Sequence, residues 1–283
     1  MATASPAVRR RRPFDVPAGL MRVWAVLVYA FLYLPILFVV VYSFNKGRRL
    51  QIWDGLGTRW YGDALGNEEI RQSLGVSLRA AALVAVLSVV LGGTAGIALA
   101  RRGGGWSKPF LVLLFMILVT PEIVDAIAFL IWFVRIDMDL PLARLVVGHS
   151  IFSSAVVTLI VRARLQGLDE SLEEAAADLG ATPFRAFRQI TLPLMLPAVI
   201  AGALLAFTFS LDDVVISSFV SIAGTTTLPT YVFSSVRTGL KGNIAAISTM
   251  MLGLTFLALV IAAVVLRRSG DSAEEVTATL TGA

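Results

Sequence analysis

The sequence predicts an all-α membrane protein, a polytopic bundle of six transmembrane helices. Its 283 residues are 57% hydrophobic and only 15% charged, and the mean hydropathy is +0.81, values far from those of soluble domains. Six apolar segments approach or exceed the roughly 20 residues that an α-helix needs to cross a bilayer. Lys and Arg gather in alternate connecting segments, as in membrane proteins whose cytoplasmic loops carry the positive charge.

The six predicted spans are residues 23–44, 76–100, 110–134, 145–161, 194–220 and 244–266. The first follows a basic run, as the apolar part of a signal peptide does. It is too long for that and lacks a small-residue cleavage site, so we interpret it as a retained helix. The fourth is short and carries polar side chains, so we expect it to lie among other helices. These side chains are His149, Ser150, Ser153, Ser154 and Thr158.

The positive charges predict the orientation in the membrane. Most of them lie in the N-terminal tail, the second and fourth connecting loops and the C-terminal tail, and the other side holds fewer. Both termini and the loop at 162–193 are therefore expected in the cytoplasm, in a multi-pass protein of the plasma (inner) membrane. The expected parts are a basic cytoplasmic tail (1–22), a first transmembrane helix with an extracytoplasmic segment (23–73), a transmembrane core (74–268) and a cytoplasmic C-terminal tail (269–283).

The composition also excludes several kinds of site. The chain has no Cys and a single His, which excludes disulfides, a thiolate catalyst and multi-histidine metal sites. The sequence contains no GxxxxGK[ST] phosphate loop, so an ATPase, if one is needed, must be another polypeptide. The pI near 10 follows from the basic loops, and no nucleic-acid partner is expected.

The segment EAAADLGATPFRAFRQITLP, residues 174–193, lies between two apolar spans. Asp169 or Ser171 is expected to cap a first helix. Gly180 suits a left-handed turn, and Thr182 is expected to cap a second helix that begins with proline. An apolar stripe follows on the second helix: Phe184, Phe187 and Ile190. The pattern predicts a helix–turn–helix that offers a face to an outside partner; the alternative is a hairpin that packs on its own bundle.

Two adjacent carboxylates, Asp212 and Asp213, lie inside the fifth apolar span. Burying a charge at this depth costs about 2.5–3.5 kcal/mol, so a pathway or binding site is the first interpretation. Helical spacing places Ser210, Asp213 and Ser217 on one face and Asp212 about 100° away, which predicts different partners for the two carboxylates. The alternative is that one or both cap a broken helix or pair with a neighbouring chain.

A second acidic pair, Glu122 and Asp125, lies in the middle of the third span. Thr120 as a cap and Pro121 at the first helical position predict a helix that restarts within the membrane. Interrupted helices beside carboxylates are typical of solute sites near the bilayer midplane. Glu122 has an alternative role, in which it only complements the exposed helix end.

Small residues and aromatics complete the predicted architecture. Gly92, Gly93 and Gly96 favour close packing between helices. Trp53 and Trp60, in the first outer segment, are expected to anchor the chain at the membrane interface. The alternative for this segment is a docking surface for an extracytoplasmic partner.

The loop resembles the "EAA loop" of binding-protein-dependent ABC importer permeases. The matching positions are Glu174, Ala175, Ala176, Gly180, Ile190, Leu192 and Pro193. Two further segments, TPEIVDAI in the third span and SLDDVVISSF in the fifth, look like the C-type permease subunit of spermidine/putrescine importers. The resemblance covers nearly the whole chain, apart from the Arg-rich head and the acidic tail after Ser269.

The resemblance implies a type I ABC importer permease fold and a transport function without catalysis. It implies a second permease subunit, two ATP-binding subunits that hold ATP and Mg, an extracytoplasmic binding protein and no cofactor in this chain. A polyamine substrate would pass Asp212, Asp213, Glu122 and Asp125, since ammonium groups need acidic partners. The alternatives are an ABC permease for another small organic solute, or an ATP-independent carrier or channel, which leaves the loop unexplained.

Overall fold

The computed structural model describes residues 18–47, 52–238 and 242–268, and its regular structure there is helical. The helices are α1 (Ala18–Ser43), α2 (Arg59–Gly66), α3 (Glu68–Arg101), α4 (Ser107–Val119), α5 (Glu122–Arg135), α6 (Pro141–Gln166), α7 (Ser171–Asp178), α8 (Pro183–Ala186), the π-helix η1 (Phe187–Thr191), α9 (Leu192–Asp212), α10 (Val215–Val220), α11 (Leu228–Thr238) and α12 (Gly242–Arg268). An isolated bridge joins Asn45 and Leu56. An all-helical architecture is therefore confirmed over the described ranges.

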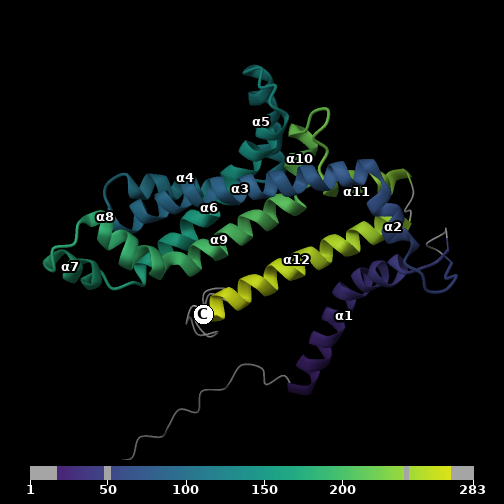
Figure 1. Cartoon of the computed structure of the whole chain (residues 1–283), viewed down its shortest axis with the longest axis horizontal. Helices are drawn as coiled ribbons and strands as arrows, with labels where there is room; N and C mark the ends of the chain where they lie inside the picture. The colour runs from purple at the N-terminus through teal and green to yellow at the C-terminus, as the bar shows by residue number, and fades with distance from the viewer. Residues whose placement is uncertain (1–17, 48–51, 239–241, 269–283) are drawn as a thin grey trace, which may run out of the picture.

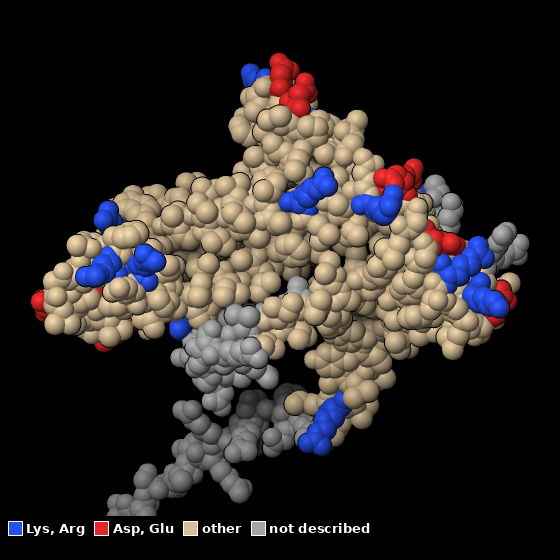
Figure 2. Space-filling view, in the orientation of Figure 1, with Lys and Arg blue, Asp and Glu red and all other residues tan. Residues whose placement is uncertain are grey.

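The long helices α3, α6 and α9 lie side by side and form the centre of the bundle (Figure 1). Helices α7 and α8 lie at one end of this bundle, and α2 and α11 lie at the other (Figure 1). Helices α5 and α10 project together from its side, and they pack against each other. Charged side chains gather mainly at the two ends and at the tip of α5, and leave a largely uncharged body between (Figure 2). This distribution suits a bundle that crosses a bilayer.

Glycines bring α3 against α6, as predicted. A Cβ atom added at Gly92 would lie 2.6 Å from the backbone oxygen of Ser154, and one at Gly96 would lie 2.8 Å from that of Thr158. Gly93 faces open space, because an added Cβ would meet no atom within 4 Å. The close approach therefore depends on two of the three glycines.

The central helix α6 buries many of its side chains, whereas the first helix, α1, is exposed. Within α6, His149, Ser150, Ser153 and Thr158 are all buried, which confirms that the polar fourth span lies among other helices. In contrast, none of the most apolar window of α1 is buried. Helix α1 packs mainly against α12 and leaves the rest of its apolar surface for lipid or another chain.

Two of the predicted spans are interrupted. The third consists of α4 and α5, which meet at an angle of 103°. The fifth ends as a continuous helix at Asp212, and α10 starts at Val215, so the expectation of one helix over residues 194–220 is wrong. Among the described residues, five helices are long and apolar enough to cross a membrane, or six if α4 and α5 together form one span.

The outer segment packs more tightly than expected. Trp60 is 9% exposed, and its indole N–H donates to the backbone oxygen of Gly47 at 3.1 Å. It packs with residues of α3 and α12, so it belongs to a protein core and not to the membrane interface predicted for it. Trp53 remains partly exposed and meets the edge of Tyr42 at a ring distance of 5.6 Å.

Candidate functional site

The loop between α6 and α9 is a helix–turn–helix, as the sequence predicted. Helix α7 ends at a left-handed glycine, Gly180, whose φ is +83°. The Gly180 N–H donates to Ala177 O, and the Ala181 N–H donates to Ala176 O, both at 2.9 Å. These two bonds form the glycine-based motif that closes many α-helices. Thr182 then caps α8 by accepting from the backbone of the third residue on, as expected.

Neither predicted residue occupies the cap position of α7, which is Glu170. The Asp169 carboxylate accepts from the Ser171 N–H at 2.9 Å, whereas Ser171 is itself the first residue of the helix. This hydrogen bond from the backbone lowers the pKa of Asp169. Asp169 therefore satisfies a free N–H at the helix start, and Ser171 does not act as the cap.

The loop exposes an apolar surface. Helix α7 buries none of its residues, and Leu179 and Phe184 are 90% and 73% exposed. Phe187, by contrast, packs against a buried cluster of α6 and α9, so the predicted stripe of Phe184, Phe187 and Ile190 is divided between outside and inside. Glu174 is also exposed. The described part of the chain offers this surface no cover, which fits docking by another polypeptide.

Arg101, the last residue of α3, ties this loop to the bundle. Its Nη1 lies 2.8 Å from Glu170 Oε1, and its Nη2 lies 3.0 Å from Glu173 Oε1. Glu173 Oε1 also accepts from the Thr191 hydroxyl at 2.7 Å. One carboxylate thus links α7 to both α3 and the base of α9. Sequence reasoning counted Arg101 only as a positive charge, because its partners lie about 70 residues away.

A second site is a cavity of about 550 Å³ within the bundle, between the two breaks. All four predicted pathway acids line it, although they come from two different spans: Glu122, Asp125, Asp212 and Asp213. Phe152 and Phe209, whose rings meet edge to face at 5.5 Å, form part of its apolar wall. The cavity therefore combines several carboxyl groups with aromatic surface.

The two breaks have similar backbone geometry. Thr120 has φ −60° and ψ 130°, and Asp213 has φ −62° and ψ 130°. The Thr120 hydroxyl donates back to Met116 O of α4 at 2.7 Å, so it does not cap α5 as expected. Pro121 occupies the cap position, and Glu122 is the first residue of α5. Glu122 and Asp125 thus lie in the first turn, where carboxylates also stabilise the helix end.

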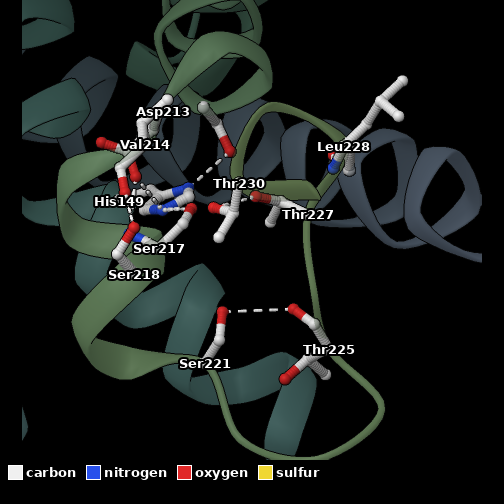
Figure 3. A network of polar contacts seen from close by, with 12 residues as sticks. His149, Asp213, Val214, Ser217, Ser218, Ser221, Thr225, Thr227, Leu228 and Thr230 are labelled. Atoms are coloured by element: carbon white, nitrogen blue, oxygen red, sulfur yellow. Dashed lines mark hydrogen bonds and ion pairs between the residues drawn. The ribbon is translucent and has the colours of Figure 1, made fainter. Parts of the chain in front are cut away.

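Asp213 belongs to a buried polar cluster around His149 (Figure 3). His149 Nε2 lies 3.2 Å from Asp213 Oδ1 and 3.2 Å from Ser217 Oγ. Its Nδ1 lies 2.8 Å from Ser210 Oγ. The Ser217 N–H donates to Asp213 Oδ1 at 2.7 Å. Ser210, Asp213 and Ser217 therefore meet as the sequence suggested, but they meet because α9 and α10 turn around His149 and not because they share one helical face.

The two adjacent aspartates differ in environment, as predicted. Asp212 is exposed to the cavity side, whereas Asp213 is buried. Glu122, the first residue of α5, lines the same cavity as both aspartates. Sequence reasoning did not include His149 in the site, since no acid stands near it in the chain. The sequence did contain one indication of its role. The single His lies inside one apolar span, and a neighbouring apolar span contains carboxylates that it could contact.

Comparison with known proteins shows the family of the chain. The family described as "Binding-protein-dependent transport system inner membrane component" matches residues 89–270. The putrescine transport system permease protein PotI of Escherichia coli (strain K12) is 42% identical over 241 residues, which cover 81% of this chain and 86% of the relative. The spermidine/putrescine transport system permease protein PotC of Haemophilus influenzae is 38% identical and covers 86% of this chain and 95% of the relative.

Solved structures share the fold at low sequence identity. A bacterial ABC transporter that imports the acidic polysaccharide alginate matches 91% of this chain and 99% of its own, with a TM-score of 0.65 and 17% identity. The inward-facing MetNI methionine ABC transporter matches 72% of this chain and 99% of its own, with a TM-score of 0.57 and 17% identity. At this identity the likeness concerns the fold, which is the one that the sequence predicted.

Proposed function

The chain belongs to the family of binding-protein-dependent transport system inner membrane components, and from this membership we propose that it imports polyamines. It is a permease subunit of an ATP-driven ABC importer. We infer a complex with a second permease subunit, two ATP-binding subunits that hold ATP and Mg, and an extracytoplasmic binding protein. In this arrangement both termini and the loop at 162–193 face the cytoplasm.

The observation that carries the substrate proposal is the cavity between the two helix breaks. Four carboxyl groups from two spans line it beside Phe152 and Phe209. Putrescine and spermidine, which the relatives' names mention, carry ammonium groups on flexible alkyl chains. Carboxylates bind such groups through charge-assisted hydrogen bonds, and aromatic faces attract cations. The cavity therefore offers both parts of a polyamine a suitable partner.

The carboxyl groups gathered in one cavity support a cationic substrate. A carboxylate only accepts hydrogen bonds, so Glu122 and Asp213, which line the same cavity, both suit a partner that donates. An ammonium group provides three N–H donors and is such a partner. In this proposal the substrate passes Glu122, Asp125, Asp212 and Asp213, and Asp213 gives the most buried contact.

The fold provides a physical link from the loop to this cavity. Helices α8, η1 and α9 form a continuous helical rod of 30 residues, Pro183–Asp212, which spans about 45 Å at 1.5 Å per residue. One end carries the Gly180 turn and the exposed loop surface, and the other end carries Asp212. Closure of the ATP-binding subunits against the loop would tilt this rod and change which side of the membrane the cavity faces.

We propose that the motif residues of the loop form the contact with the ATP-binding subunits. They are Glu174, Ala175, Ala176, Gly180, Ile190, Leu192 and Pro193. The exposure of Glu174, Leu179 and Phe184 supports this docking surface. An ATP-independent carrier would use the same acids but has no need of such a surface, and an importer of another small solute would keep the surface and differ in the cavity.

The test is uptake of radiolabelled putrescine and spermidine by Asp212→Asn and Asp213→Asn variants. Asn keeps the size and removes the charge, and losing one hydrogen bond to a charged group costs about 1.5–3 kcal/mol. Uptake per complex should therefore fall about tenfold or more for at least one variant. Asp139→Asn, an exposed acid beyond the end of α5, is the matched control and should transport normally.

The outcomes separate the parts of the proposal. Normal uptake per complex in both variants would remove the two aspartates from the pathway. A lower amount of complex with unchanged uptake per complex would assign them a structural role. If the unmodified complex neither binds nor takes up a polyamine, the substrate proposal fails while membership of the permease family remains.

A further inference from the structure

His149 contacts the most buried of the proposed pathway acids, Asp213. We propose that His149 is a positioning residue, which holds the Asp213 carboxylate in the orientation that meets the cationic substrate. This inference rests on the proposed function, since it concerns how Asp213 is presented to the cavity.

The ring is fixed at both nitrogen atoms. The side chains of His149 and Asp213 are only 2% and 6% exposed, and Nε2 lies 3.2 Å from Asp213 Oδ1. Because a carboxylate only accepts, Nε2 must carry the hydrogen of this pair. Nδ1 lies 2.8 Å from Ser210 Oγ on α9. Contacts at both nitrogens determine the plane of the ring and the direction of its N–H.

Asp213 needs such a partner because its backbone is not held in a helix. It stands in the break after α9, with extended φ and ψ. The helix that follows the break, α10, has only six residues. Asp213 Oδ1 accepts from the Ser217 N–H, which belongs to that short helix and moves with it. His149 belongs to α6, a 26-residue helix of the central bundle, and thus ties the carboxylate to a rigid element.

The two contacts share one carboxylate oxygen. Both the His149 Nε2 and the Ser217 N–H meet Oδ1, which leaves Oδ2 of Asp213 for other partners at the cavity that this residue lines. His149 has no nitrogen left to bind a substrate, and an imidazole does not attract an ammonium group through its N–H. It therefore acts through Asp213, by directing Oδ2 to the cation.

The experiment compares two amides that replace the ring. A Gln side chain reaches about as far as Nε2, whereas an Asn side chain reaches only about as far as Nδ1. His149→Gln therefore keeps a donor for Asp213. His149→Asn loses this donor, although the Asn side chain is still polar. The complete importer, reconstituted in liposomes with saturating polyamine-loaded binding protein, gives both uptake and ATP hydrolysis. We expect His149→Asn to lower uptake per ATP about tenfold, as the loss of one hydrogen bond to a charged group does.

His149→Gln should retain most of the uptake per ATP. The double variant with Asp213→Asn should be no worse than Asp213→Asn alone, because His149 has nothing left to position. Ser150→Ala is the matched control: this buried hydroxyl of the same helix donates only to Val146 O of its own helix, and its removal should leave uptake per ATP unchanged.

Three results would overturn the inference. They are equal losses in the Asn and Gln variants, additive losses in the double variant, or a lower amount of complex with normal uptake per ATP. The last result is the one that a purely structural role of the ring predicts. Failure of the proposed function gives a different result, in which the unmodified importer takes up no polyamine at all.

Discussion

Gly180 allows the most direct test of the loop as an energy-coupling element. Its φ of +83° lies in the left-handed region, which an L residue with a branched Cβ strongly disfavours. An added Cβ would meet no atom within 4 Å, so Gly180→Val introduces backbone strain and no steric clash within the described chain. The two hydrogen bonds that close α7, from Gly180 and Ala181 at 2.9 Å, depend on this backbone conformation.

The cost of Gly180→Val follows from the backbone alone. A non-glycine residue in the left-handed region costs about 1–2 kcal/mol, and more for a β-branched residue. A cost of that size lowers the ratio of native to non-native turn about 5- to 30-fold. We expect the ATP hydrolysis stimulated by the loaded binding protein, and uptake per complex, to fall accordingly, while insertion into the membrane is unchanged.

The variant Gly180→Asn distinguishes an effect of the backbone conformation at this position from an effect of the added side chain. Asn tolerates the left-handed region better than other non-glycine residues, so this variant should keep most of the stimulated ATP hydrolysis. Equal losses in the Val and Asn variants would show that the space at Gly180 matters and not its backbone conformation. Full activity of Gly180→Val would refute the reasoning altogether.

Three further predictions concern packing, orientation and the tie between α3 and the loop. Gly92→Ala should lower the amount of folded complex in the membrane, since overpacking costs about 1–3 kcal/mol, whereas Gly93→Ala should be neutral; immunoblotting of membranes with intact protein as the standard measures both. Asp178→Cys, in a chain without other Cys, should resist an impermeant thiol reagent in sealed cells, and labelling from outside would reverse the predicted orientation. Arg101→Gln should reduce uptake per ATP hydrolysed, because α7 loses its ion pairs to α3; an unchanged ratio in reconstituted liposomes would leave the ion pairs with Glu170 and Glu173 as surface contacts of little effect.

Local features of this protein were accessible from the sequence. The Gly180 turn, the Thr182 cap and the burial of the polar fourth span all follow from residues close together in the chain. Turn and cap geometry depends on φ, ψ and hydrogen bonds over three to five residues. Hydropathy is likewise a property of a short window. The cap at Thr120 was wrong because its hydroxyl donates to Met116 O one turn earlier, and the cap at Ser171 was wrong because the helix begins with Ser171 itself.

The site around His149 depended on contacts that no local pattern reports. Asp213 lies 64 residues after His149, and Arg101 lies about 70 residues before its carboxylate partners. Helical periodicity assumed an unbroken fifth span, and the break after Asp212 changed the direction of each side chain that followed.

The sequence by itself determined the membrane character, the positions of the apolar segments and the form of the loop, and its motifs indicated the family. Solvent transfer and local backbone preference decide the first three features, and both act within a short stretch of chain. Only the tertiary structure decided that the two helix breaks face one cavity, that His149 holds Asp213, and that Arg101 ties the loop to α3. Those contacts depend on how separate helices pack, which the side chains of the whole bundle determine together.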